Sequence, residues 1–87
     1  MRGMSADQLL LVADEVCAHN HVSVRDYAAL AAAAATTTAS INGVPVHRSV
    51  RAAKRSLGQA IVALRPLTGA NEVFAQVAGE ILERINN

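Results

Sequence analysis

The chain has 87 residues, a formal net charge of +1 and an apolar fraction of 52%, as expected for one small globular domain. A charge so close to zero disfavours a dedicated nucleic-acid binder, and no apolar stretch is long enough to anchor the chain in a membrane. The single cysteine, Cys17, excludes an internal disulfide and favours a reducing, cytoplasmic location.

The first predicted helix follows Ser5 and runs to about His19. Ser5 and Gln8 have the spacing of a capping box, which satisfies free amides at a helix start. Its inner stripe is formed by apolar residues at helical spacing, namely Leu9, Val12, Ala13, Val16 and Cys17. Leu11 lies off this stripe, so we expect an exposed apolar side chain that could serve as an interface.

The second predicted helix runs from Val24 to about Ala35, with Ser23 as its N-cap and Asp26 in its first turn. One of its faces carries Tyr27, Leu30, Ala31 and Ala34. Residues 41–45 follow as a connector, in which Gly43 tolerates a positive φ angle and Pro45 can stand near a helix start. A short hairpin is the competing interpretation of these residues.

The third predicted helix extends from about His47 to Leu64 and is amphipathic. Its apolar stripe consists of Val50, Ala53, Leu57, Ala60, Ile61 and Leu64. Its other face is basic and is a candidate surface for a partner, formed by Arg48, Arg51, Lys54 and Arg55.

Pro66 and Gly69 predict a loop, after which a fourth helix begins near Asn71. This helix has a wide apolar arc that consists of Val73, Phe74, Val77, Ala78, Ile81, Leu82 and Ile85. The four segments together predict an all-α fold, a small helical bundle that forms a single domain over residues 1–87.

Three parts of the chain carry a resemblance to a known family. Residues 24–27 (Val-Arg-Asp-Tyr) precede Leu30, Ala39, Ser40 and Gly43, residues 65–73 form a Pro-containing loop between two helices, and residues 81–86 close the last helix. This pattern resembles the death-on-curing toxins of the Fic/Doc family, whose loop reads His-Pro-Phe-x-Asp/Glu-Gly-Asn-x-x-Arg. The similarity covers about residues 4–87 and implies a Fic/Doc-like fold.

The loop departs from the family at the residues that carry its chemistry. In the family the His is the general base, the acidic residue holds the metal, the Gly-Asn backbone cradles phosphate and the Arg neutralises developing charge. Arg65 stands at the position of the base, and its guanidinium stays protonated and cannot accept a proton. Gly69 stands at the metal position, and Glu72 and Val73 replace a Lys and the Arg. The degenerate loop thus comprises Arg65, Pro66, Leu67, Gly69, Ala70 and Asn71.

The resemblance and these departures imply a catalytically inactive Fic/Doc-like protein without metal or cofactor. It would act as a toxin-like effector of bacterial or phage origin that binds a bacterial host protein, itself, or both. One alternative is a divergent nucleotidyl- or phosphotransferase of the Fic/Doc type. A second is a helical DNA-binding module that uses the basic third helix, for which binding should weaken steeply with salt.

Other polar residues have simpler structural interpretations. Asn71 could bind an anion at a helix start, although nucleotide is not an expected partner and either Thr68 or Asn71 could merely cap the helix. His19, His21 and His47 lack the spacing of metal ligands, and Cys17 is expected to be a buried structural thiol.

Overall fold

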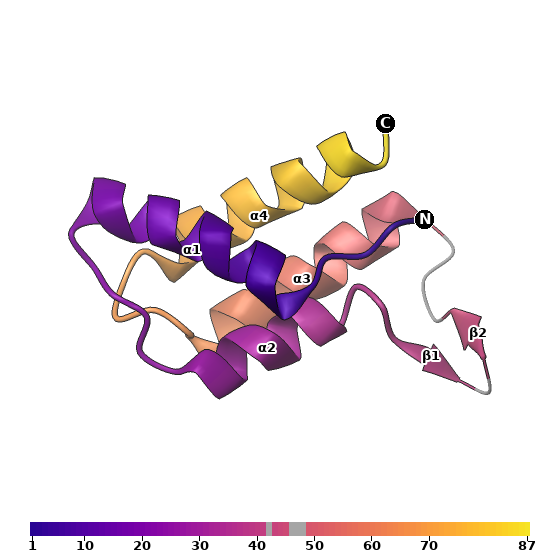
Figure 1. The fold of residues 1–87 in the computed structure, drawn as a ribbon, viewed down its shortest axis with the longest axis horizontal. Coiled ribbons are helices and arrows are strands. Elements are labelled where there is room, and N and C mark those ends of the chain that lie inside the picture. Colours follow the sequence, from indigo (N-terminus) through magenta and orange to yellow (C-terminus); the bar gives the residue numbers. More distant parts are fainter. Residues whose placement is uncertain (42, 46–48) are drawn as a thin grey trace.

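Four helices and one small hairpin make up the part of the chain that the structure describes, residues 1–41, 43–45 and 49–87 (Figure 1). In this computed structural model the helices are α1 (Ala6–Asn20), α2 (Tyr27–Ala35), α3 (Val50–Leu64) and α4 (Asn71–Ile85). The strands β1 (Ser40–Ile41) and β2 (Val44–Pro45) join α2 to α3. The predicted all-helical fold is confirmed, and the connector forms a hairpin.

The hairpin is a two-residue antiparallel ladder. Ser40 lies opposite Pro45 and Ile41 lies opposite Val44. Gly43, in the turn between the strands, has a φ angle of 79°, which glycine adopts without the steric cost of a Cβ atom. The turn therefore uses the conformational freedom that the sequence predicts for this glycine.

The capping box predicted for α1 is present. Ser5 Oγ accepts a hydrogen bond from the Gln8 amide at 3.1 Å, and the Ser5 amide donates to Gln8 Oε1 at 2.9 Å. The helix ends at His21, whose left-handed backbone (φ 54°) directs its amide to the Cys17 carbonyl. Of the predicted inner stripe, Cys17 is only half-buried, and the buried members are Leu9, Val12, Ala13 and Val16.

The predicted start of the second helix at Val24, with Ser23 as its cap, is wrong. Helix α2 begins at Tyr27, and the Asp26 carboxylate caps it by accepting from the Ala29 amide at 3.1 Å. The preceding residues are extended because Val24 forms an antiparallel bridge with Leu67, on the distant loop. Long-range backbone pairing has displaced the first turn of the helix.

The buried faces of the helices are narrower than the sequence predicts. Tyr27 is 49% exposed, Leu64 is 41% exposed and Val73 is 45% exposed, although the sequence predicts an apolar face for each. All three lie within two residues of a helix end, where neighbouring elements no longer cover the side chain. Among the buried residues of the last two helices, Asn71 has the one polar side chain, and the others are Ala53, Leu57, Ile61, Phe74, Ala78, Gly79 and Leu82.

Helix α3 begins three residues later than predicted. The Ser49 hydroxyl accepts from the Ala52 amide at 3.1 Å and makes Ser49 the N-cap. The predicted start, His47, lies outside the described residues. Helix α4 begins at Asn71, as predicted.

All four helices contribute to one core. The α3–α4 pair has the most extensive contact, while α2 packs on α3, and α1 packs on both α2 and α4. Phe74 is the largest of the fully buried side chains in the described part of the chain and lies among leucine, isoleucine and alanine. Figure 1 shows both labelled termini and the hairpin at one end, with the turns that follow α1 and α3 at the other.

The residues before α1 are fixed to the ends of α2 and α4. Met4 is buried, and its amide donates to the Thr37 hydroxyl at 2.8 Å. The same hydroxyl donates to the Ala34 carbonyl at 2.8 Å. The Arg2 amide donates to Asn86 Oδ1 at 2.6 Å, and Asn86 Nδ2 donates to the Arg2 carbonyl at 2.8 Å. These bonds make the first residues part of the packed structure.

The substitution Thr37→Val tests this attachment. Valine has nearly the shape of threonine but leaves the buried Met4 amide without an acceptor, which costs about 1–3 kcal/mol. We expect the free energy of unfolding, measured by urea denaturation and circular dichroism, to fall by that amount. The exposed Thr38 is the matched control, since Thr38→Val should change it by less than about 0.5 kcal/mol. Equal effects of the two variants would contradict the assignment.

Candidate functional site

The loop that resembles a degenerate active site is tightly attached to the protein through its backbone. Arg65 has a left-handed conformation (φ 50°, ψ 64°) and ends α3, with its amide donating to the Ile61 carbonyl at 2.9 Å. Its side chain is exposed, whereas Pro66 and Leu67 are buried. The Arg65 guanidinium, which the resemblance aligns with the family's base, is therefore exposed, while the two residues that follow it are packed.

Arg25 binds the end of α3. Its guanidinium donates to the Arg65 carbonyl through Nε at 2.9 Å and Nη2 at 2.5 Å, and Nη2 also donates to the Leu64 carbonyl at 3.0 Å. A cation at this position is favourable because the last carbonyls of a helix lack partners and carry partial negative charge. Arg25 therefore has a structural role, because its Nε and Nη2 atoms are both bound to the backbone at the end of α3.

The extended residues before α2 pair with the same loop. The amides of Arg25 and Asp26 both donate to the Pro66 carbonyl, at 2.7 and 3.1 Å. The Thr68 amide donates to the Ser23 carbonyl at 2.9 Å, and the Ser23 amide donates to the Thr68 hydroxyl at 3.0 Å. Thr68 therefore binds residue 23 and does not cap α4, contrary to that interpretation of the sequence.

Asn71 is buried and fully engaged within the loop. Its Oδ1 accepts from the Leu67 amide at 3.0 Å, and its Nδ2 donates to the Leu67 carbonyl at 3.1 Å. Ala70, with a left-handed backbone (φ 57°), is the N-cap of α4 and provides no side-chain hydrogen bond. The prediction that Asn71 could cap the helix is therefore wrong, and its amide group is already bound to backbone.

Gly69, which the resemblance aligns with the family's metal-holding residue, has little room for a side chain. A Cβ atom at Gly69 would lie 3.2 Å from Cγ1 of Val22, which is closer than most real contacts. An Asp or Glu at this position would require Val22 to shift. Within residues 1–41, 43–45 and 49–87, no group of three or more His, Cys, Asp or Glu side chains is arranged to hold a metal ion.

The structural role of Asn71 can be tested by Asn71→Leu. The substitution leaves the amide and the carbonyl of buried Leu67 without partners, so we expect the free energy of unfolding to fall by about 2–4 kcal/mol. Chemical denaturation of the purified variant measures this loss. Exposed Asn87 supplies the control, because Asn87→Leu should be nearly neutral. Wild-type stability of Asn71→Leu would show that the pair with Leu67 is dispensable.

Cys17 and the described histidines do not form a reactive site. Burial raises the pKa of the Cys17 thiol, and the nearby Asp14 carboxylate raises it further, so the nucleophilic thiolate is disfavoured. Cys17 is half-buried against the core, so the prediction of a buried thiol holds only in part. The ring of His19 bonds through Nδ1 to the Glu15 carbonyl on its own helix, and His21 is the exposed C-cap of α1.

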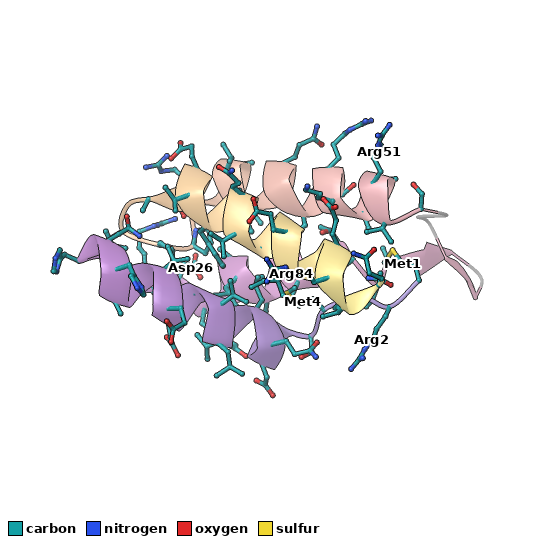
Figure 2. The ribbon with its side chains drawn as sticks, turned by 90° about the horizontal axis from the view of Figure 1, so that it is seen from above. Met1, Arg2, Met4, Asp26, Arg51 and Arg84 are labelled. Atoms are coloured by element: carbon teal, nitrogen blue, oxygen red, sulfur yellow. The ribbon has the colours of Figure 1, made fainter. Side chains whose placement is uncertain are left out.

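The basic face predicted on the third helix is only partly available. Arg51 and Arg55 are exposed on α3, while Lys54 forms an ion pair with Glu83 of α4. The stem of Lys54 passes over Gly79, where an added Cβ atom would lie 3.0 Å from the lysine carbons. Arg48 lies outside the described residues. Figure 2 shows Arg51 pointing away from the body of the protein.

These cations border a groove on the outer surface of α3 and α4. The groove has a volume of about 760 Å³ and an apolar floor, and it is lined by Arg51, Lys54, Arg55, Gly58, Gln59, Val62, Ala63, Ala75 and Gln76. Gly58 opens the floor, because a Cβ atom there would meet nothing within 4 Å. Val62 is 42% exposed. The groove is therefore an open apolar depression. Small residues such as Gly58 and Ala75 form its floor, and long polar residues such as Arg51 and Arg55 form its border.

Leu11 is exposed, as predicted. It is 68% exposed on the outer face of α1, more than any other large hydrophobic side chain in the described part of the chain. Of the four residues one helical turn away, all of them exposed, Asp7, Asp14 and Glu15 are acidic and Gln8 is neutral. The sequence identified Leu11 but not this acidic border.

No protein-family model matches the chain, and neither a curated protein nor a solved structure matches it. The resemblance to the Fic/Doc family therefore rests on the residues quoted above. In the described residues, no helix is both long and apolar enough to cross a membrane.

Proposed function

We propose that the chain is a non-catalytic, Fic/Doc-like protein that acts by binding another protein through the groove between α3 and α4. The observation that carries this proposal is the combination of an apolar floor at Gly58, Val62 and Ala75 with exposed arginines at the rim. A concave apolar surface with a few polar groups at its border is the usual form of a binding site. Contact of apolar surface with water is also unfavourable in free energy, and a bound partner would cover that surface.

The chemistry of the partner follows from the groove. An amphipathic helix can place its apolar stripe on the floor while its polar residues meet the rim. Arg51 and Arg55 favour acidic residues beside that stripe, since complementary charge speeds encounter and selects the partner. The preferred ligand is therefore an acidic amphipathic helix, and the family resemblance points to a bacterial protein as its source.

The loop supports the non-catalytic part of the proposal. Arg65 cannot accept a proton, the side-chain amide of Asn71 is already bound to Leu67, and Gly69 lies close to Val22. Catalysis of phosphoryl or nucleotidyl transfer depends on positioned groups that stabilise charge and move protons. The loop provides none of the family's acid or base groups.

The binding proposal is tested by titrating the ¹⁵N-labelled chain with a synthetic acidic amphipathic helix while recording amide shifts. We expect the shifts to concentrate at Gly58, Val62 and Ala75. Gly58→Gln should weaken binding about tenfold by filling the floor with a polar side chain, an effect of about 1.4 kcal/mol. Gly58→Ala controls for helix propensity because it adds only one methyl group. Equal binding of the same peptide with Lys in place of Glu, or shifts confined to other surfaces, would contradict the proposal.

The absence of transferase activity is tested with ATP labelled at the α or the γ phosphate. The purified chain, Mg²⁺ and a bacterial lysate are incubated together, with an active Fic enzyme as positive control. We expect no protein to be labelled beyond the lysate alone, because Arg65 offers no general base. Labelling that requires the chain would contradict the non-catalytic proposal, whether or not it survives in Arg65→Ala.

A further inference from the structure

The exposed residues of α1 form a ridge that has the properties expected of a ligand for the groove. This acidic ridge consists of Asp7, Leu11, Asp14 and Glu15, all exposed. Asp7 lies one turn before Leu11, and Asp14 and Glu15 lie one turn after it, so acidic groups flank the leucine on both sides along the helix. The ridge is an amphipathic helical surface with a single protruding apolar side chain.

The groove matches the ridge in charge and in shape. On α3, Arg55 lies one turn before Gly58 and Arg51 lies two turns before it. If Leu11 enters the depression at Gly58, an acidic residue one turn from Leu11 faces Arg55 in either direction of the incoming helix. The opening at Gly58, where a Cβ atom meets nothing within 4 Å, leaves room for the leucine side chain.

The two surfaces lie on different sides of the molecule, so one chain cannot join its own ridge to its own groove. In Figure 2, α3 with the outward-pointing Arg51 lies at one side, α1 lies at the opposite side, and α4 lies between them in that view. Contact between two different surfaces is heterologous, and it repeats from one copy to the next.

We infer that the groove takes the acidic ridge of a second copy of this chain, with Leu11 at Gly58 and the acidic groups of the ridge against Arg51 and Arg55. The association is head-to-tail and reversible. This inference rests on the proposed function, because both use the groove as a docking site. It adds that the partner in the groove is a second copy of the chain. Charge complementarity makes it sensitive to salt, because ion pairs at the rim of an interface are screened.

Charge reversal provides a sharp test. The groove variant carries Arg51→Glu and Arg55→Glu, near the N-terminus of α3, and the ridge variant carries Asp14→Arg and Glu15→Arg, toward the C-terminus of α1. All four substituted residues are exposed and lie outside the buried stripes of their helices, so both variants should fold. Association of the full chain is measured by sedimentation velocity up to about 1 mM protein, at low salt and at about 0.5 M NaCl.

We expect the mean mass of the wild type to rise with concentration at low salt and to fall back at high salt. Each variant alone should lose at least about tenfold in association constant, and an equimolar mixture of the two should regain it. The mixture is informative because the reversed groove of one variant accepts the reversed ridge of the other. Leu11→Gln should also weaken association about tenfold, whereas Glu80→Arg, an exposed acidic residue outside the ridge, should not.

Two outcomes would overturn the inference. One is a wild type that stays monomeric over the whole concentration range at low salt, and the other is a mixture that associates no better than its components. Either outcome leaves the proposed function standing if the acidic peptide still binds at Gly58 and the groove variant loses that binding. If neither the peptide nor a second copy binds, both proposals fail.

Discussion

The buried amide of Asn71 against the backbone of Leu67 is the interaction on which the rest of the structure depends. Leu67 is buried in the connection between α3 and α4, where its amide and carbonyl would otherwise lack partners at a cost of about 1–3 kcal/mol each. Asn71 satisfies both and fixes the turn, and Leu67 in turn pairs with Val24 in front of α2. Asn71 thus holds the connection between α3 and α4, the two helices that carry the groove.

The parts of the fold that the sequence predicts are those governed by local chemistry. Ser5 and Gln8 form the expected capping box, Gly43 occupies a turn, and α4 begins at Asn71. The start of α2 was missed because the competing partner of Val24 lies more than forty residues away in the chain, beyond the reach of any local pattern. In the same way, the sequence predicts that α4 begins near Asn71, but it does not predict that the Asn71 side chain binds the Leu67 backbone.

The candidate site was predicted in part. The exposure of Leu11 and the cations of α3 follow from helical periodicity, because each lies off an apolar stripe. The groove does not, since Gly58 and Ala75 belong to different helices and form one floor only when these helices pack. The sequence nevertheless contained one signal for the groove. Glycine within a helix lowers its stability by about 1 kcal/mol relative to alanine, so a glycine at position 58 indicates that a small residue is needed there. The pairing of Lys54 with Glu83, which reduces the free charge on α3, could not be read from either segment alone.

The reciprocal hydrogen bonds between the Arg2 backbone and the Asn86 side chain have a consequence for how the molecule opens. Asn86 also donates to the Leu82 carbonyl, so its side chain joins the residues before α1 to the last turn of α4. Helix ends usually fray independently, at little energetic cost. In this chain, release of the N-terminal residues removes partners of the side chain that also binds the last turn of α4, so we expect the two ends of the sequence to open together.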